Sequence, residues 1–148
     1  MRKSRGEQSR VYRGLDNAMK KMNDKNGCSV IAMSIAFGIS YEDAYKELEF
    51  VGRIHGRGVS QFQLELVAKR LAYQVNGETW LVSKEKIVHL KEMMGVTPTL
   101  NNIVSVLPKG KKYIVSTRDH VVTVKGGRVH DWAEGRKLQV QNIIEVKI

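Results

Sequence analysis

Three residues that lie far apart in the sequence have the types needed for a thiol nucleophile site: Cys28, His120 and Asp131. A thiol attacks a carbonyl carbon as the thiolate, so it needs a base that takes its proton and a carboxylate that orients this base. Cys28 is the single cysteine of the chain and comes directly before an apolar run, where the start of a helix favours a thiolate. The sequence therefore predicts a Cys–His–Asp site, and the alternative is an inert core cysteine.

The spacing around Gly126-Gly127 indicates how the histidine and the aspartate meet. A Gly-Gly pair between two β-branched runs favours a two-residue hairpin turn, which places Val124 opposite Val129. Because side chains alternate along a strand, His120 and Asp131 are then expected on one face as diagonal neighbours. The other face of the same hairpin is expected to carry Val121, Thr123, His130 and Trp132.

The cysteine is expected at the start of a buried helix that runs from about residue 28 to residue 37. The apolar residues of this segment cover more than one face, which is typical of a central helix, and a glycine follows its last residue. Further helices are predicted after Ser40, Ser60 and Thr99, which can cap helix N-termini, and within residues 82–95. In the helix after Ser60, part of the apolar stripe is expected to consist of Phe62, Leu66 and Leu71.

The second half of the chain is rich in Val, Ile, Tyr and Thr, which favour β-strands. Strands are predicted near residues 112–116 and 120–125, with a return strand from residue 128 and one or two more within residues 137–148. Helices come first and antiparallel strands second, so the predicted fold class is α+β.

The expected organisation is a basic flexible tail over residues 1–12, followed by a single domain over residues 13–148. The net charge is +10, and half of it lies in the first 25 residues, which hold eight Lys and Arg against three Asp and Glu. A solvated tail and an arm that contacts nucleic acid both fit this charge. Because the sequence shows no membrane-spanning run, no secretory signal and no CxxC pair, we expect a non-secreted, cytoplasmic protein with no membrane contact, no metal and no cofactor.

Four segments of the chain carry a further indication. They are "NGC" at 26–28, "GISYEDA" at 38–44, "GRIHGRG" at 52–58 and "HVVTVKGGRVHDW" at 120–132. Together they resemble a family of small bacteriophage proteins that are similar to papain-like cysteine peptidases, and the resemblance covers about residues 23–135. It implies a papain-like fold, in which N-terminal helices with a central cysteine-bearing helix pack on a C-terminal antiparallel sheet. It also implies that Cys28 is the nucleophile, His120 the general base and acid, and Asp131 the residue that orients the histidine.

The chain departs from the family pattern beside two of these residues. Gly27 stands where an acidic residue usually precedes the cysteine, and Asp119 stands where a glycine precedes the histidine. Papain-like enzymes commonly carry a glutamine a few residues before the cysteine, and its amide stabilises the oxyanion. Here the oxyanion candidates are Asn23 and Asn26, together with the backbone N–H of the cysteine. The glycines of residues 52–58 are expected to form a mobile turn rather than a phosphate-binding loop.

The predicted function is that of a papain-like cysteine hydrolase of phage origin, a peptidase or isopeptidase that acts on a protein or peptide of the host or the phage. Such a protein works in the cytoplasm of the bacterial host. Two alternatives stay open. One is a non-enzymatic phage effector on a papain-like scaffold that binds a host protein or nucleic acid. The other is a thiol acyltransferase or deamidase, which uses the same residues.

Overall fold

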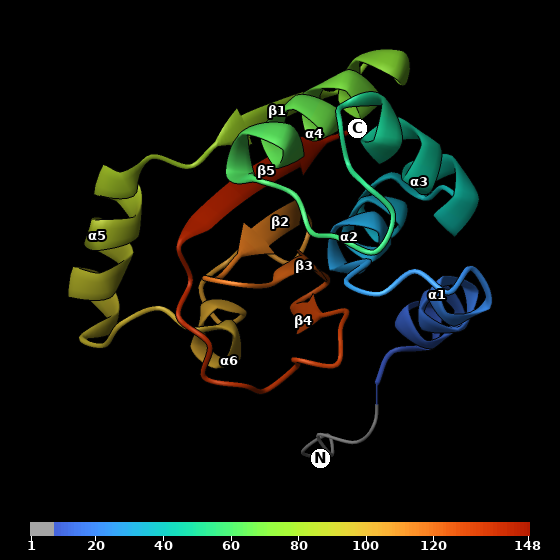
Figure 1. Cartoon of the computed structure of the whole chain (residues 1–148). Helices are drawn as coiled ribbons and strands as arrows, with labels where there is room; N and C mark the ends of the chain where they lie inside the picture. Colours follow the sequence, from blue (N-terminus) through green and yellow to red (C-terminus); the bar gives the residue numbers. More distant parts are fainter. Residues whose placement is uncertain (1–7) are drawn as a thin grey trace.

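The structure is a computed structural model that describes residues 8–148 (Figure 1). Helix α1 (Arg10–Lys21) opens it, with Ser9 as the N-cap whose hydroxyl accepts the N–H of Tyr12. The prediction of a flexible tail over residues 1–12 is therefore wrong for residues 10–12, and residues 1–7 lie outside the described part. Residues 10–12 belong to the helix because Tyr12 is buried in the core, beside the partly buried Leu15, Ala18, Met19 and Met22.

Three predicted helices follow and position the site. Helix α2 (Cys28–Phe37) is buried from its second residue to its last, as expected of a central helix, and ends at Gly38 with a φ of 66°. Helices α3 (Tyr41–Phe50) and α4 (Gln61–Gln74) begin at the predicted serine caps, and α4 carries a complete capping box. These local capping signals fixed the helix starts because each needs only neighbouring residues.

The strands form one antiparallel sheet in the order β1-β5-β2-β3-β4. Their bounds are β1 (Glu78–Leu81), β2 (Lys112–Ser116), β3 (Val121–Lys125), β4 (Arg128–Val129) and β5 (Asn142–Lys147). The glycines between β3 and β4 form the predicted two-residue turn, with φ of 62° and 74°, and Val124 lies opposite Val129 as expected. Strand β1 was not predicted, because four mostly exposed residues give no clear alternation.

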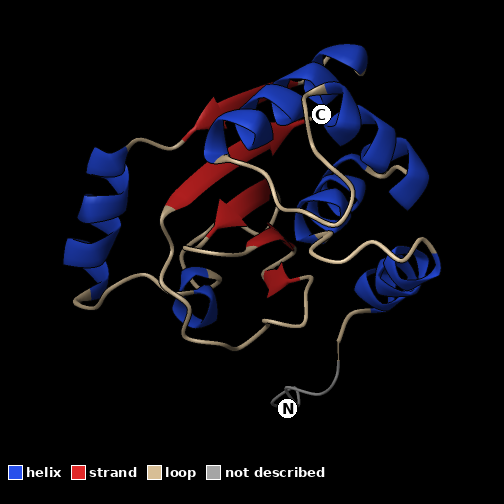
Figure 2. Ribbon diagram, viewed as in Figure 1, coloured by secondary structure: helices blue, strands red, loops and turns tan. Residues whose placement is uncertain are grey.

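Helices combined with one antiparallel sheet confirm the predicted α+β class. Helices cover both faces of this sheet (Figure 2). One face carries Ile114, Ile144 and Val146 and packs against α1–α4. The other face carries Tyr113, Val115 and Ile143 and packs against α6 (Leu100–Ile103) and the partly buried side of α5 (Lys84–Met94). The cysteine-bearing helix therefore lies against the centre of the sheet, on the same side as α1, α3 and α4.

The predicted apolar stripe of α4 is wrong at two of its three positions. Phe62 is 73% exposed and Leu66 43% exposed, whereas Leu71 is buried. The helix instead packs through Leu64, Val67, Ala68, Leu71 and Ala72. Helix α4 has apolar residues on two faces, and only its position on the sheet decides which face becomes core.

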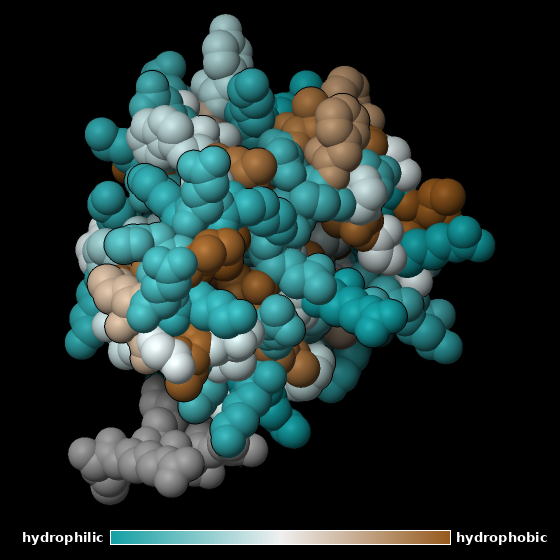
Figure 3. All heavy atoms as spheres, turned by 90° about the vertical axis from the view of Figure 1, so that its left-hand side faces the viewer, coloured by the Kyte–Doolittle hydropathy of each residue, from teal (hydrophilic) through white to brown (hydrophobic). Residues whose placement is uncertain are grey.

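The face of the molecule on the α5 side is mainly polar. Figure 3 shows hydrophilic side chains over most of it, with separate apolar areas between them. Across residues 8–148, no helix combines the length and the apolar character needed to cross a bilayer.

Candidate active site

A cleft of about 710 Å³ opens where the N-terminus of α2 meets the end of the sheet, and all three predicted residues line it. Cys28 is the first residue of α2, His120 directly precedes β3, and Asp131 is the second residue after β4. Helix α1 contributes Tyr12 to the same cleft, which the sequence analysis did not predict. The fold thus brings together residues that are about 90 and 100 positions apart in the sequence.

The histidine and the aspartate form the predicted contact. His120 Nε2 lies 2.6 Å from Asp131 Oδ2, and the side chain of Asp131 is only 3% exposed. The same carboxylate oxygen accepts the backbone N–H of Ala133 at 2.9 Å, which fixes its direction. The ring of Trp132 lies against the imidazole at a tilt of 39°, with 4.8 Å between centroids.

The imidazole also interacts with the thiol. Because Nε2 faces Asp131, Nδ1 is the ring nitrogen left for Cys28. Burial alone lowers the pKa of His120, but hydrogen bonds to Asp131 and to Cys28 outweigh burial and raise this pKa to about 9. At neutral pH the thiol therefore faces an imidazolium, and it does so at a helix N-terminus.

Two hydrogen bonds fix β3 and the residue before it. The buried hydroxyl of Thr123 donates to the carbonyl of Ala32 in the middle of α2 at 2.6 Å. The N–H of Thr117 donates to the carbonyl of His120 at 2.9 Å and closes the turn between β2 and β3. The first contact ties β3 to α2, and the second holds the backbone of His120 at the start of β3.

His120 was expected on the face opposite Thr123, but both residues face α2. Thr123 contacts α2, whereas Val122 and Val124 pack on the opposite face of the sheet. Strict alternation would place His120 with the two valines and away from the thiol. His120 avoids this because β3 begins one residue later, so its backbone does not follow the pleat.

The two residues that flank the aspartate also test the predicted alternation. His130 points away from the dyad, as predicted, and its Nε2 lies 3.3 Å from the carbonyl of Lys125. Trp132 was expected on the face opposite His120 but packs on its ring. The prediction is wrong for Trp132 because β4 ends at Val129 and the chain then turns, so alternation no longer applies.

The two oxyanion candidates lie in different places. Asn23 does not line the cleft, and its carbonyl accepts from His55 Nε2 at 3.0 Å. Asn26 does line the cleft, but its Nδ2 donates to the carbonyl of Gly56 at 3.0 Å. The first hydrogen bond within α2 runs from Ile31 N–H to the carbonyl before Cys28, so the Cys28 N–H has no acceptor inside the helix. Of the predicted donors, this N–H lies in the cleft with no acceptor inside its helix, so it can donate to an oxyanion.

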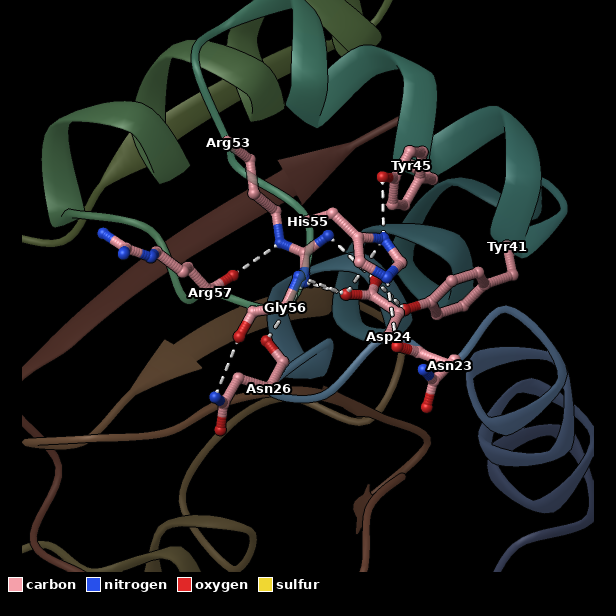
Figure 4. Close-up of polar contacts among 9 residues, drawn as sticks. All are labelled: Asn23, Asp24, Asn26, Tyr41, Tyr45, Arg53, His55, Gly56 and Arg57. Carbon is pink, nitrogen blue, oxygen red and sulfur yellow. Dashed lines mark hydrogen bonds and ion pairs between the residues drawn. The ribbon is translucent and has the colours of Figure 1, made fainter.

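A buried cluster beside the cysteine was missed in the sequence, and Figure 4 shows it. The Asp24 side chain is fully buried and accepts both guanidinium N–H groups of Arg53, at 2.8 and 2.9 Å. It also accepts the Tyr41 hydroxyl at 2.5 Å and the Gly56 N–H at 2.8 Å. Burial raises the pKa of Asp24, but the hydrogen bonds from Arg53 and Tyr41 dominate and lower it. We call Asp24, Tyr41, Arg53 and Gly56 the Asp24 cluster.

The Asp24 cluster corrects the prediction for residues 52–58. Arg53 is buried, and its Nε donates to the carbonyl of Arg57 at 2.8 Å, so this segment is tied down rather than a mobile turn. No spacing rule links an aspartate to an arginine 29 residues later, and for this reason the sequence did not reveal the pair.

Within residues 8–148, no group of three or more His, Cys, Asp or Glu side chains is placed to hold a metal ion. Comparison of the chain with protein-family models, with curated proteins and with solved structures gave no match.

Proposed function

We propose that the protein is a cysteine hydrolase that cleaves an amide or isopeptide bond in a protein or peptide. One observation carries the proposal: His120 bridges Asp131 and Cys28 in an open cleft at the N-terminus of α2. This is the arrangement that thiol nucleophile catalysis requires. The central cysteine-bearing helix on an antiparallel sheet further supports a papain-like fold, and the motif resemblance supports a phage origin.

The chemistry follows from the protonation states. The Cys28 thiolate attacks the substrate carbonyl carbon, and the carbonyl π electrons move to the oxygen, which accepts the Cys28 N–H. The His120 imidazolium gives its proton to the leaving nitrogen as the C–N bond breaks, which leaves a thioester on the cysteine. Water then attacks the thioester, His120 takes the proton of that water, and the acid leaves as the thiolate is restored. Asp131 keeps the ring oriented through both steps.

The test is the rate of Cys28 alkylation by iodoacetamide at pH 6 and at pH 8. An ordinary thiol with a pKa near 8.5 reacts more than about 50-fold more slowly at pH 6. Since the imidazolium persists throughout this range, we expect the wild-type rate to change by less than about fivefold. His120→Gln should restore the steep dependence, and Cys28→Ala gives the background. A wild-type rate with the ordinary steep dependence would contradict the proposal.

Mass spectrometry of peptides incubated with the protein then separates the reactions that share this site. A cut indicates hydrolysis, a one-dalton shift indicates deamidation, and a transferred group indicates an acyltransferase. Each product should disappear with Cys28→Ala. Acyl transfer and deamidation use the same thioester chemistry, and therefore only the products distinguish them.

A second candidate function is that of a non-enzymatic effector, and it rests on two observations. The side-chain amide of Asn26 is tied to the carbonyl of Gly56 and Asn23 lies outside the cleft, and α1 carries exposed Arg10, Arg13, Lys20 and Lys21. Such a basic face suits nucleic acid or an acidic host protein. Nucleic-acid binding would weaken steeply with salt, and binding of a host protein would persist in Cys28→Ala without cleavage of that protein.

A further inference from the structure

We propose that the Asp24–Arg53 ion pair is the positioning device of the active site, which fixes the backbone entering Cys28 and one wall of the cleft. This inference rests on the proposed function, because it assigns the pair a role in thiol chemistry. Asp24 and Arg53 touch none of the reacting groups, so they are positioning residues. The structure supports the inference through three connections from the cluster to the site.

The first connection runs through the segment before the cysteine. Arg53 Nη2 reaches the carbonyl of Asn26 at 3.3 Å, in addition to its bond to Asp24. Asn26 in turn donates to the carbonyl of Gly56, so this segment is held at two places by residues 53–56. Asn26 has a φ of 59°, an unfavourable backbone conformation that these contacts keep in place.

The second connection runs through the residue directly before the nucleophile. A Cβ atom at Gly27 would collide with the Tyr41 hydroxyl and with the Met19 side chain. The Tyr41 hydroxyl is held against Gly27 because it donates to Asp24. The ion pair thereby fixes the peptide unit that presents the Cys28 N–H, the proposed oxyanion donor.

The third connection runs along the chain from Gly56 into the cleft. The Asp24 carboxylate accepts the Gly56 N–H, and residues 58–61, which follow closely, line the cleft beside Cys28. Ser60 then caps α4 and fixes the far end of this wall. One buried carboxylate therefore orients both the segment that carries the nucleophile and the facing wall of the cleft.

Stability alone is a weak reason for such a pair. Replacing both partners of a buried ion pair by apolar residues of similar size is often neutral or stabilising, whereas removing one partner is strongly destabilising. Replacing both partners together therefore removes the hydrogen bonds of the ion pair while the protein can still fold. The test variant is the double substitution Asp24→Leu/Arg53→Met.

The chain offers a matched control in the ion pair between α3 and α4. Arg70 Nε lies 2.6 Å from Glu47 Oε2, and neither residue lines the cleft. Glu47→Leu/Arg70→Met makes the same chemical change away from the site. Both doubles and the wild type are compared by thermal unfolding and by iodoacetamide alkylation at pH 6 and pH 8.

We expect the Asp24→Leu/Arg53→Met protein to unfold cooperatively but to alkylate on the order of 10- to 100-fold more slowly at pH 6 than the wild type, with a steeper pH dependence. The control double should alkylate like the wild type. A folded Asp24→Leu/Arg53→Met protein with wild-type rates at both pH values would overturn the inference. Ordinary thiol behaviour of the wild type would instead overturn the proposed function, so the two failures are distinct.

Tyr41→Phe keeps the inference testable if the double variant does not fold. This change removes one hydrogen bond to Asp24 and the hydroxyl beside Gly27, and it leaves both charges and the ring in place. We expect alkylation at pH 6 to slow by about three- to tenfold with cooperative unfolding retained. An unchanged rate in folded Tyr41→Phe would contradict the positioning role.

Discussion

Two buried carboxylates flank the candidate nucleophile, and they differ in whether the cationic partner can lose its proton. Asp24 pairs with Arg53 and Asp131 pairs with His120, at 2.8 and 2.6 Å, and neither carboxylate side chain is more than 3% exposed. An arginine in a protein stays charged at every accessible pH, whereas a histidine can lose its proton. The first pair can therefore only hold its position, and the second can also move a proton.

The two pairs also differ in how fully their carboxylates are hydrogen-bonded and in whether they border the cleft. Asp24 accepts hydrogen bonds from Arg53, Tyr41 and Gly56, which use both carboxylate oxygens. Asp131 receives its bonds on Oδ2, and its partner ring still borders the cleft. The Asp24–Arg53 pair is therefore suited to holding the backbone in place. The Asp131–His120 pair, whose histidine can titrate and borders the cleft, is suited to proton transfer.

The largest expected effect comes from removing the charge of each carboxylate in turn. Asp24→Asn leaves the Arg53 guanidinium buried without its countercharge, so we expect it to lower the free energy of unfolding by about 3–5 kcal/mol. Asp131→Asn should cost about 2–3 kcal/mol, because His120 loses its raised pKa but can become neutral and keep a hydrogen bond. Urea unfolding at pH 7 measures both.

Equal losses in the two variants would break this comparison, since they would mean that both pairs act as fixed anchors. Glu47→Gln serves as the surface control. Its partner Arg70 is partly exposed, and we expect a loss of less than about 1 kcal/mol.

The two pairs should also differ in the pH range where they contribute stability. The pKa of His120 is raised from 6.5 to about 9, so its stabilisation is complete below pH 6.5 and is lost as the pH rises through 9. This loss is on the order of 3 kcal/mol. The pKa of Asp24 is lowered from 3.8, so its stabilisation is present above pH 3.8 and is lost only as the pH falls below that value.

Urea unfolding of Cys28→Ala at pH 6, 7.5 and 9 tests this difference, because a thiolate at Cys28 would add an opposite pH dependence that offsets that of His120. Cys28→Ala should lose stability across the range, and adding Asp131→Asn should flatten the slope because the pKa of His120 then returns toward its ordinary value. Adding Asp24→Leu/Arg53→Met should keep the slope of Cys28→Ala. A flat profile of Cys28→Ala would show that His120 is not held as an imidazolium.

The parts of the fold that were predictable are those that depend on neighbouring residues. Ser40 and Ser60 cap α3 and α4 and thereby mark where these helices start. Gly126-Gly127 sets the register of the β3–β4 hairpin. Strand β1 depends on pairing with β5, which is distant in sequence, and the buried face of α4 depends on where the sheet lies. Neither leaves a local pattern.

The candidate site shows the same division. The predicted contact between His120 and Asp131 is present, although the strand alternation from which it was expected holds at neither residue. Which face of the sheet His120 and Asp131 occupy was not predictable. Both residues lie just outside the strands, where side chains no longer alternate between faces. The bond from Asp24 to Arg53 could not be found either, since buried charge pairs carry no periodicity.

The smallest effects concern Gly27, where the anchor reaches the nucleophile. Gly27→Ala places a Cβ against the Tyr41 hydroxyl and Met19, so we expect a loss of about 1–3 kcal/mol and slower alkylation of Cys28. Gly14→Ala is the matched control. Gly14 lies in α1 with no atom within 4 Å of an added Cβ, and the change should stabilise the protein by about 0.5–1 kcal/mol.

Combining Gly27→Ala with Tyr41→Phe shows whether the collision is with the anchor itself. Phenylalanine lacks the hydroxyl that the new Cβ would meet, so the double variant should lose less stability than the sum of the two single variants. Urea unfolding of the four proteins measures this coupling. Strict additivity would mean that Met19 alone carries the steric cost, and the link from Asp24 through Tyr41 to the cysteine would then be absent.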